Sequence, residues 1–287
     1  MIDGIGNRNM TPGVEDFFQR SLTAHLPPEK FRRLQATTVL MGGCGGGSNI
    51  AELLARKGVG RFILSDLDVY EPHNIRQRCS LASTLGVEKV PATAARLKDV
   101  QPHVEVEEVR EGVTPENAEG LVTRSDVIVD MIDLHALHAK VAIHRAARRQ
   151  GKYVLTAPSV VNGAMLWVFA PDGPTFEAFT GYEPGAAMHE IASRHLKRMI
   201  DRYPEEAPEA MYEAAARGER TIPLDGVGVD QAAVMVAAAV ENLVLGRFDR
   251  VITVPRGLHV DVSNPAALAT IVDRSREFEV HHAETCS

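Results

Sequence analysis

The residues best placed to do chemistry come early in the chain, where a run of glycines is followed by acidic side chains. Glycines let the backbone take positive φ and approach a ligand closely, and this run is interrupted only by Cys44: Gly42, Gly43, Gly45, Gly46 and Gly47. Asp66 lies nineteen positions after Gly47, and Asp68 follows it closely. A dinucleotide-binding fold places the carboxylate that binds ribose hydroxyls at this spacing, beside a loop that receives phosphate. The sequence therefore predicts a nucleotide site.

A polar loop follows these aspartates. Pro72 prevents a helix there, so residues 69–79 are expected to leave the carboxyl end of a strand, the edge at which open α/β sheets bind ligands. Arginine offers a fixed fork of donors suited to phosphate. The loop holds two arginines, two amides and a histidine: Arg76, Arg78, Asn74, Gln77 and His73. An ordinary solvated loop is the alternative, and it has less weight because this loop directly follows a ribose-type acid.

Lys89 and Asp133 are two further charged candidates. Lys89 begins a helix expected over 90–97, where a cation is unfavourable to the helix dipole. A bound triphosphate would compensate this charge; an exposed lysine without a partner is the alternative. Asp133 ends a buried strand expected over 126–133, and a carboxylate there can hold Mg²⁺, which takes few protein ligands. Asp133 can equally cap the helix that follows, and Asp130 competes for the metal role.

Alternating strands and helices must position these residues. Short apolar runs typical of strands occur at 37–41, 62–64, 126–133, 153–156 and 164–169, and residues 104–109 alternate apolar and acidic side chains, as in a strand with one solvent-exposed face. Helical patterns occur at 48–58, 90–97, 134–149 and 227–245. This alternation predicts an α/β fold with a mostly parallel sheet. Two late runs, 251–254 and 258–262, are expected to form a closing hairpin around Pro255.

The N-terminus and a central insert are the least regular regions. Residues 1–36 precede the first strand and are expected to form a helical segment, with a helix over 14–26 that carries Arg20. Residues 172–223 are expected to form a mobile insert or crossover that covers the substrate. Two helices are expected inside it, at 194–203 and 209–216.

The composition limits the class of protein. The chain has 287 residues and 45% hydrophobic content, enough for a sizeable core, and we treat residues 1–287 as one domain. A net charge of −7 argues against nucleic acid as a partner. Cys44, Cys79 and Cys286 make no disulfide framework, and no signal-peptide pattern opens the chain, so a cytoplasmic protein is expected. The most apolar stretch, 232–240, is too short to span a bilayer, so no membrane contact is expected.

In this order the residues resemble the E1-like adenylating family, which includes the ThiF and MoeB proteins of bacteria and the adenylation domains of ubiquitin-activating enzymes. The resemblance covers residues 20–246. Unrelated dinucleotide folds lack the loop from Asn74 to Gln77 and the lysine, Lys89, that follows it. The resemblance implies an α/β, Rossmann-like E1 adenylation fold, with a mostly parallel sheet, antiparallel C-terminal strands and flanking helices.

The resemblance also implies roles for individual residues. The implied ATP contacts are Gly42, Gly43, Gly45, Gly47, Asp66, Asp68, Asn74, Gln77 and Lys89. The implied catalytic residues are Arg20, Arg76, Lys89 and Asp133, and Asp133 is also associated with Mg²⁺. The family has an N-terminal Tyr-x-Arg-Gln pattern whose arginine reaches ATP on a partner subunit. Residues 18–21 are similar to it, although Phe18 and Ser21 replace the tyrosine and glutamine. Arg20 would then act in trans, within a homodimer.

Three further positions depart from the family pattern. Cys44 replaces the second glycine of the loop. The family's Asn-x-x-Arg-Gln is one residue shorter here, so Arg76 and Arg78 compete for the catalytic arginine, and Arg76 is preferred. Many members carry Cys-x-x-Cys zinc pairs, but residues 175–178 hold no cysteine at the place of the first pair. No structural zinc is therefore expected.

These roles predict an ATP-dependent adenylyltransferase that activates a carboxylate as an acyl adenylate and releases pyrophosphate. The carboxylate belongs to the C-terminus of a small carrier protein, to a peptide or to a small-molecule acid, and the sequence leaves this choice open. An NAD-dependent oxidoreductase is one alternative; it explains Asp66 but neither Asn74 to Gln77 nor Lys89. A non-catalytic nucleotide-binding scaffold is the other, and Cys44 and the shortened loop favour it.

Overall fold

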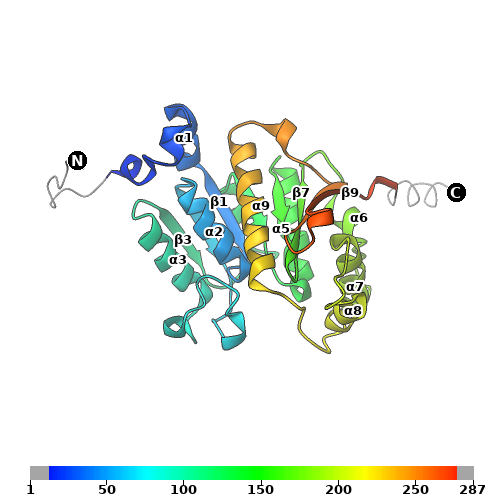
Figure 1. Cartoon of the computed structure of the whole chain (residues 1–287). Helices are drawn as coiled ribbons and strands as arrows, with labels where there is room; N and C mark the ends of the chain where they lie inside the picture. Colours follow the sequence, from blue (N-terminus) through cyan, green and yellow to red (C-terminus); the bar gives the residue numbers. More distant parts are fainter. Residues whose placement is uncertain (1–12, 277–287) are drawn as a thin grey trace.

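The computed structural model describes residues 13–276, and one nine-stranded sheet forms the centre of this part of the chain (Figure 1). The parallel strands, in order from one edge, are β3 (Glu105–Val109), β2 (Arg61–Ser65), β1 (Thr38–Gly42), β4 (Val127–Asp130) and β5 (Val154–Thr156). The sheet continues with antiparallel β7 (Gly163–Phe169), β8 (Arg256–Asp261) and β9 (Ala269–Asp273), and β6 (Ser159–Val160) pairs with β7. The predicted fold class, a mostly parallel sheet with antiparallel C-terminal strands, is confirmed.

Helices cover both faces of the sheet because the central strands are apolar on both sides. Val39 and Met41 of β1 face one core, and Leu40 between them faces the other. The first core is closed by α2 (Gly46–Arg56), α3 (Lys89–Val100) and α9 (Gly226–Val244). The second is closed by α4 (Ala118–Thr123), α5 (Leu137–Arg149) and α6 (Phe176–Thr180). Figure 1 shows α2 and α9 side by side in front of the sheet.

Helix α9 is the longest and most apolar of the described helices. It has the length and composition of a membrane span, but 56% of its most apolar window is buried inside the protein. Its buried side chains pack against α2 and β7. In this fold α9 is therefore a core helix that joins the two halves of the sheet.

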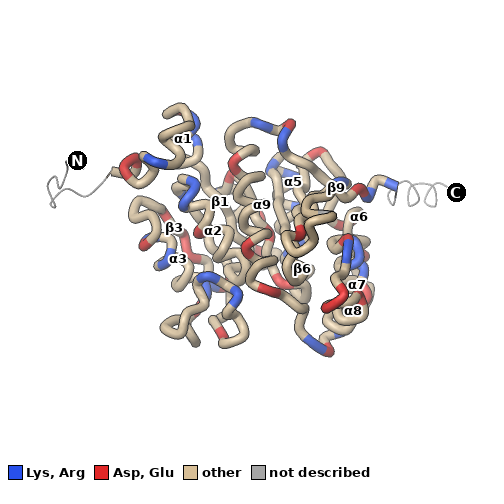
Figure 2. Tube along the Cα trace, viewed as in Figure 1, with Lys and Arg blue, Asp and Glu red and all other residues tan. Residues whose placement is uncertain are grey.

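The central insert is folded against the second face. It contains α6, α7 (Met188–Met199) and α8 (Glu209–Ala216). The last of these agrees with the expected helix at 209–216, whereas α7 begins and ends earlier than the expected 194–203. Figure 2 marks both acidic and basic residues on α7 and α8, and Lys197 on α7 pairs with Glu213 on α8 at 2.9 Å.

The N-terminal segment is less helical than expected. The helix expected over 14–26 is replaced by two short 3₁₀ turns, η1 (Val14–Phe18) and η2 (Leu22–Ala24). The first α-helix, α1 (Pro28–Ala36), begins at Pro28, because the fixed φ of proline suits the first turn of a helix. Residues 1–12 of the expected segment, and Cys286, lie outside the described residues.

The expected closing hairpin around Pro255 is wrong. The Val254 amide donates to the Val168 carbonyl of β7, and Leu258 and Asp261 of β8 then pair with Leu166 and Gly163 of the same strand. The segment from 254 to 261 therefore runs in one direction along β7 and does not turn back on itself. The closing pair is formed by β8 and β9 instead.

Candidate functional site

The glycine loop joins β1 to α2 at the carboxyl edge of the sheet. Gly43 has φ +96°, and a Cβ there would lie 2.3 Å from the Met131 carbonyl oxygen. Only glycine fits this position without moving the backbone after β4. The first turn of α2 is built from Gly46 and Gly47, so its amides lie open to a ligand at the positive end of the helix dipole.

Cys44 replaces a family glycine without closing the loop. Its side chain is 0% exposed and belongs to the core beneath α2, while its backbone amide donates to Asp66 Oδ2 at 2.6 Å. Burial raises the pKa of the Cys44 thiol well above its ordinary value, so the thiol stays protonated and unreactive. The Cys44 side chain therefore lies in the core and does not project into the open space beside the loop.

Asp66 lies where a ribose-binding carboxylate is expected. It follows β2 directly and is half-buried. Oδ2 accepts the Cys44 amide, and Oδ1 accepts the Asp68 amide at 2.9 Å. Because each carboxylate oxygen has two lone pairs, the two backbone donors fix the orientation of Asp66 and leave acceptor capacity for ribose hydroxyls.

Lys89 is the first residue of α3, and Asp68 is its partner. Lys89 Nζ lies 2.9 Å from Asp68 Oδ2, with the lysine side chain 10% exposed and the aspartate side chain 58% exposed. The charge expected to compensate this lysine is thus supplied by the chain itself. Because Asp68 is exposed, water can solvate its carboxylate in place of the lysine, and a phosphate in the glycine loop would compete with Asp68 for the Lys89 ammonium.

The polar loop arranges its amides and arginines in different ways. Asn74 is buried in η3 (Pro72–Asn74), and its Oδ1 accepts the Glu71 amide. Arg76 Nη1 donates to the His73 carbonyl at 2.7 Å, and burial lowers the pKa of the Arg76 guanidinium. No carboxylate among the described residues pairs with Arg76, so its charge is available to an anion.

Gln77 is a loop residue whose side chain lies against the glycine loop. It is 6% exposed, and its Nε2 lies 3.0 Å from the position that a Cβ on Gly45 would take. Its Oε1 is buried and has no hydrogen-bond partner among the described residues. An unpaired buried amide oxygen is unfavourable by about 1–3 kcal/mol, which marks this point as a place for a ligand donor or an ordered water.

The two aspartates at the end of β4 have separate environments. Asp133 is exposed, and its Oδ1 accepts the His135 amide at 2.8 Å, so it caps η5 (Leu134–Ala136). Asp130 is 0% exposed and pairs with Lys140 at 2.8 Å and His144 at 3.0 Å. Burial alone would raise the pKa of Asp130, but Lys140 and His144 hold it far below its usual range. Asp130 is therefore committed to the interior, and Asp133 remains open to solvent.

Arg20 lies at the opposite edge of the sheet from the glycine loop. It is exposed on the turn between η1 and η2. Nearby, Leu22 lies against Gly58 and Gln35 donates to the Gly58 carbonyl, in the connection that leads into β2. Asp66 follows the other end of β2. Within one chain Arg20 is thus separated from the other candidates by the length of the strand.

The sequence does not identify three polar residues near the site, of which Asn49 and Glu52 are buried and Asp230 is half-exposed. Asn49 and Glu52 of α2 and Asp230 of α9 form a polar network with Arg78. No local pattern marks them, because Asn49 and Asp230 lie 181 positions apart. Their only signal in the sequence is a polar side chain within an apolar helical stretch.

Two other features carry no further role in the site. No group of three or more His, Cys, Asp or Glu side chains suited to a metal occurs within residues 13–276. An open hollow of about 570 Å³ lies between α7 and α8, lined by His189, Glu190, Ser193, Arg194, Glu213 and Arg217. None of the glycine-loop residues lines it.

Comparison with known proteins gives one family and one fold. The profile described as "ThiF family" matches residues 18–267. The chain is 41% identical over 103 residues to the adenylyltransferase and sulfurtransferase MOCS3 of Bos taurus, a match that covers 35% of this chain and 23% of that protein. It is 30% identical over 162 residues to the SAMP-activating enzyme E1 of Haloferax volcanii, covering 55% of this chain and 59% of that enzyme. The chain thus spans less than two thirds of either relative.

Solved structures agree on the fold. E. coli MccB crystallised with MccA superposes with a TM-score of 0.66 at 18% identity, covering 91% of this chain and 72% of that one. MccB crystallised with ATP gives a TM-score of 0.60 at 17% identity, covering 85% and 65% of the two chains. At this identity the likeness shows a shared architecture.

Proposed function

This chain belongs to the ThiF family, and we propose that it uses ATP to adenylate a carboxylate. In the proposed reaction a carboxylate oxygen attacks the α-phosphorus of ATP. The bond from that phosphorus to the oxygen bridging to the β-phosphate breaks, and pyrophosphate leaves with the electron pair. The products are an acyl adenylate and pyrophosphate. No general base is required, because a carboxylate is already ionised at neutral pH.

The arrangement around the glycine loop supports ATP as the nucleotide. Asp66 is fixed by the loop amide of Cys44 and is oriented for ribose hydroxyls. Lys89 forms an ion pair with Asp68, and the Asp68 backbone amide donates to Asp66. The observation that carries the proposal is that Lys89, whose ion-pair partner is exposed, lies close to the ribose-type acid Asp66. An NAD-dependent oxidoreductase needs the acid and has no use for the lysine.

Cationic side chains do most of the proposed catalysis. Negative charge develops on the phosphate oxygens as the bond to pyrophosphate breaks, and fixed positive groups stabilise it. We assign this role to Lys89 and Arg76, together with the open amides at the start of α2. We prefer Arg76 to Arg78, because Arg78 is held by Asp230 and Glu52 whereas Arg76 has no such partner among the described residues.

Asp133 is suited to be a protein ligand of Mg²⁺. It presents an exposed carboxylate just after β4, at the edge that also holds Gly42, since Met131 donates its amide to the Gly42 carbonyl. Mg²⁺ is commonly held by one or two carboxylates together with phosphate oxygens. When bound, the ion would supply positive charge to the phosphates, and Asp133 would hold it at this edge of the sheet.

Arg20 joins the proposed site only in a homodimer. Because Arg20 lies at the amino edge of its own sheet, it can approach ATP only on a second copy of the chain. We therefore propose a homodimer in which each subunit completes the site of the other. We also propose that the described residues form one adenylation domain, acting in the cytoplasm, where Cys44 and Cys79 would stay reduced.

The surface beside the site supports a polypeptide as the carrier of the carboxylate. Large exposed apolar side chains gather on the single segment from 67 to 87: Leu67, Val69, Ile75, Leu81, Leu85 and Val87. Ile75 is 84% exposed and is directly followed by Arg76. Exposed apolar groups of this kind are typical of protein contact surfaces. A C-terminal carboxylate of a peptide or small carrier protein suits such a surface better than a small acid does.

Two measurements test the proposal. The first is thermal unfolding with ATP–Mg²⁺ and with NAD; stabilisation by ATP–Mg²⁺ and none by NAD is expected, and the reverse would favour an oxidoreductase. The second is pyrophosphate release from ATP in a screen of peptides, small carrier proteins and small acids. Binding of ATP with no pyrophosphate release from any of them would favour a non-catalytic scaffold.

A further inference from the structure

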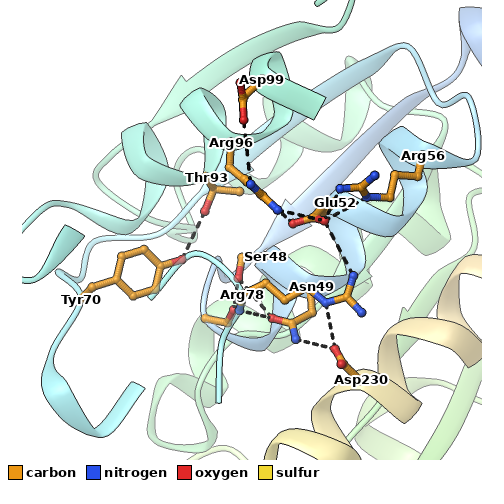
Figure 3. A network of polar contacts seen from close by, with 11 residues as sticks. Ser48, Asn49, Glu52, Arg56, Tyr70, Arg78, Thr93, Arg96, Asp99 and Asp230 are labelled. Atoms are coloured by element: carbon orange, nitrogen blue, oxygen red, sulfur yellow. Dashed lines mark hydrogen bonds and ion pairs between the residues drawn. The ribbon is translucent and has the colours of Figure 1, made fainter. Parts of the chain in front are cut away.

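The residue after Gln77 is tied to two helices that lie far apart in the sequence (Figure 3). The Arg78 backbone amide donates to Asn49 Oδ1 of α2 at 2.9 Å. Arg78 Nε donates to Asp230 Oδ1 of α9 at 3.0 Å, and Asn49 Nδ2 donates to the same oxygen at 2.8 Å. Arg78, Asn49 and Asp230 thus close a ring of hydrogen bonds in which one carboxylate oxygen joins the loop to both helices.

Glu52 restrains the other end of the Arg78 side chain. Glu52 is 3% exposed and lies 3.8 Å from Arg78, 2.9 Å from Arg56 and 2.9 Å from Arg96. Burial opposes ionisation of Glu52, but Arg96 and Arg56 lower its pKa below the usual value, so it is an anion at neutral pH. Moving the Arg78 guanidinium to a nucleotide phosphate would remove a cation from Glu52 and from Asp230 together. Arg78 therefore serves as an anchor for the loop through both its backbone amide and its side chain.

The anchor determines where Gln77 can lie. Gln77 directly precedes Arg78, and its buried amide lies against Gly45 with Oε1 unpaired among the described residues. A buried amide with an unpaired oxygen is unfavourable, so this position of Gln77 needs a cause in the surrounding structure. The backbone beside Gln77 is held in place, because the next amide is fixed by Asn49 and the next side chain by Asp230.

We propose that Asp230 is a positioning residue for the nucleotide: through Arg78 and Asn49 it holds the Gln77 amide at the entrance of the glycine loop, and it does not touch the nucleotide itself. This inference rests on the proposed function only in taking ATP as the ligand. On this inference α9 contributes to the affinity of the site for ATP, although its residues lie more than 140 positions after the polar loop.

The test compares dissociation constants for ATP–Mg²⁺, measured by calorimetry, across a set of variants whose folding is checked by urea unfolding. Asp230→Ala removes the shared acceptor and is expected to weaken ATP binding about tenfold (about 1.4 kcal/mol). Asp230→Asn keeps an acceptor oxygen without the charge and should weaken binding by a smaller factor. In pyrophosphate exchange the change should appear in KM for ATP, with kcat within about twofold of wild type, since no group that contacts the reacting atoms is altered.

Two further variants separate positioning from general support of the fold. In a Gln77→Ala background, Asp230→Ala should change ATP affinity less than about twofold, because its effect passes through Gln77. Arg56→Ala serves as the matched control, since Arg56 pairs with Glu52 but has a half-exposed side chain and no contact with the loop; its ATP affinity should equal that of the wild type.

The inference is overturned if Asp230→Ala leaves the affinity unchanged, if its full effect persists in the Gln77→Ala background, or if Arg56→Ala weakens ATP binding equally. A wild-type protein that binds ATP but exchanges no pyrophosphate with any carboxylate would count against the proposed reaction alone, because the affinities still decide the role of Asp230. A wild-type protein that does not bind ATP would overturn both.

Discussion

The buried ion pair at the end of β4 gives a prediction whose size follows from the structure. Asp130 is 0% exposed and Lys140 has a 5% exposed side chain, with 2.8 Å between Asp130 Oδ1 and Lys140 Nζ. Lys140→Met keeps most of the side-chain volume and removes the cation. The substitution leaves Asp130 with His144 as its remaining partner, and removing one partner of a buried pair is destabilising by about 3–5 kcal/mol. We expect a loss of this size at pH 7.

The same substitution should make the loss depend on pH. In the wild type, Lys140 and His144 hold the pKa of Asp130 below its value in the unfolded chain, so this stabilisation is present above about pH 4 and is lost below it. Without Lys140, only His144 still opposes the effect of burial, and we expect the pKa of Asp130 in the folded state to rise above the unfolded value. The folded variant then takes up a proton as the pH falls through this raised pKa, and its stability recovers relative to the wild type. The difference between the two proteins should therefore shrink from pH 8 to pH 5.

Urea unfolding at each pH measures this difference, followed by the fluorescence of Trp167. It is the only tryptophan of the chain, and it is fully buried with Nε1 bonded to the Met199 carbonyl. The double variant Asp130→Asn, Lys140→Met is the control. It lacks both charges, so it should be more stable than Lys140→Met at pH 7, and its difference from the wild type should vary little between pH 5 and pH 8. A loss below about 1 kcal/mol at pH 7, or a loss that stays constant with pH, would refute the account of this pair.

Three other predictions follow from individual positions. Gly43→Ala should destabilise the protein and weaken ATP binding together, because φ is +96° and a Cβ would lie 2.3 Å from the Met131 carbonyl oxygen; calorimetry and urea unfolding of one sample check both, and normal ATP binding would be contrary to the loop geometry. Val161→Asn should raise the free energy of unfolding by about 1 kcal/mol, because Val161 has φ +49° and asparagine tolerates this region far better than a β-branched residue; a lower unfolding midpoint in urea would contradict this. Burial lowers the pKa of His195 to about 3, so the unfolded chain binds a proton below pH 6.5 that the folded protein excludes, and stability should fall by up to about 1.4 kcal/mol per pH unit between pH 6.5 and pH 3. In urea unfolding, His195→Leu should make the free energy of unfolding depend less steeply on pH in this range. An unchanged slope would exclude His195 as the cause of the pH dependence.

The parts of the fold that the sequence predicts are those determined by local pattern. The β1 run, the glycines after it and the aspartate after β2 are read from short-range periodicity and spacing, and the structure brings Asp66 to the loop amide of Cys44. The core helices α5 and α9 were located for the same reason, since their apolar residues recur at helical spacing. Such signals need no knowledge of distant contacts.

The sequence-based predictions fail where contacts between residues far apart in the sequence determine the structure. The chain after Val251 was expected to fold on itself, but β7 offers a free edge that pairs with it in a single direction. The predicted helix begins later than α7 does: the first residues of α7, from Met188 to Glu190, are exposed, although Ile191 and Ala192 after them are buried at helical spacing. The role of Asp230 was not visible at all, since it depends on Asn49 and Arg78, which only the folded chain brings within hydrogen-bonding distance.

The proposed adenylation depends above all on Lys89, so the most direct test is carboxylate-dependent exchange of labelled pyrophosphate into ATP by the wild type and by Lys89→Met. The polypeptide that scores in the release screen supplies the carboxylate. We predict exchange by the wild type and a fall of about 10²–10³-fold in the variant, with urea unfolding showing that the variant is folded. Exchange at the wild-type rate in Lys89→Met would contradict the account.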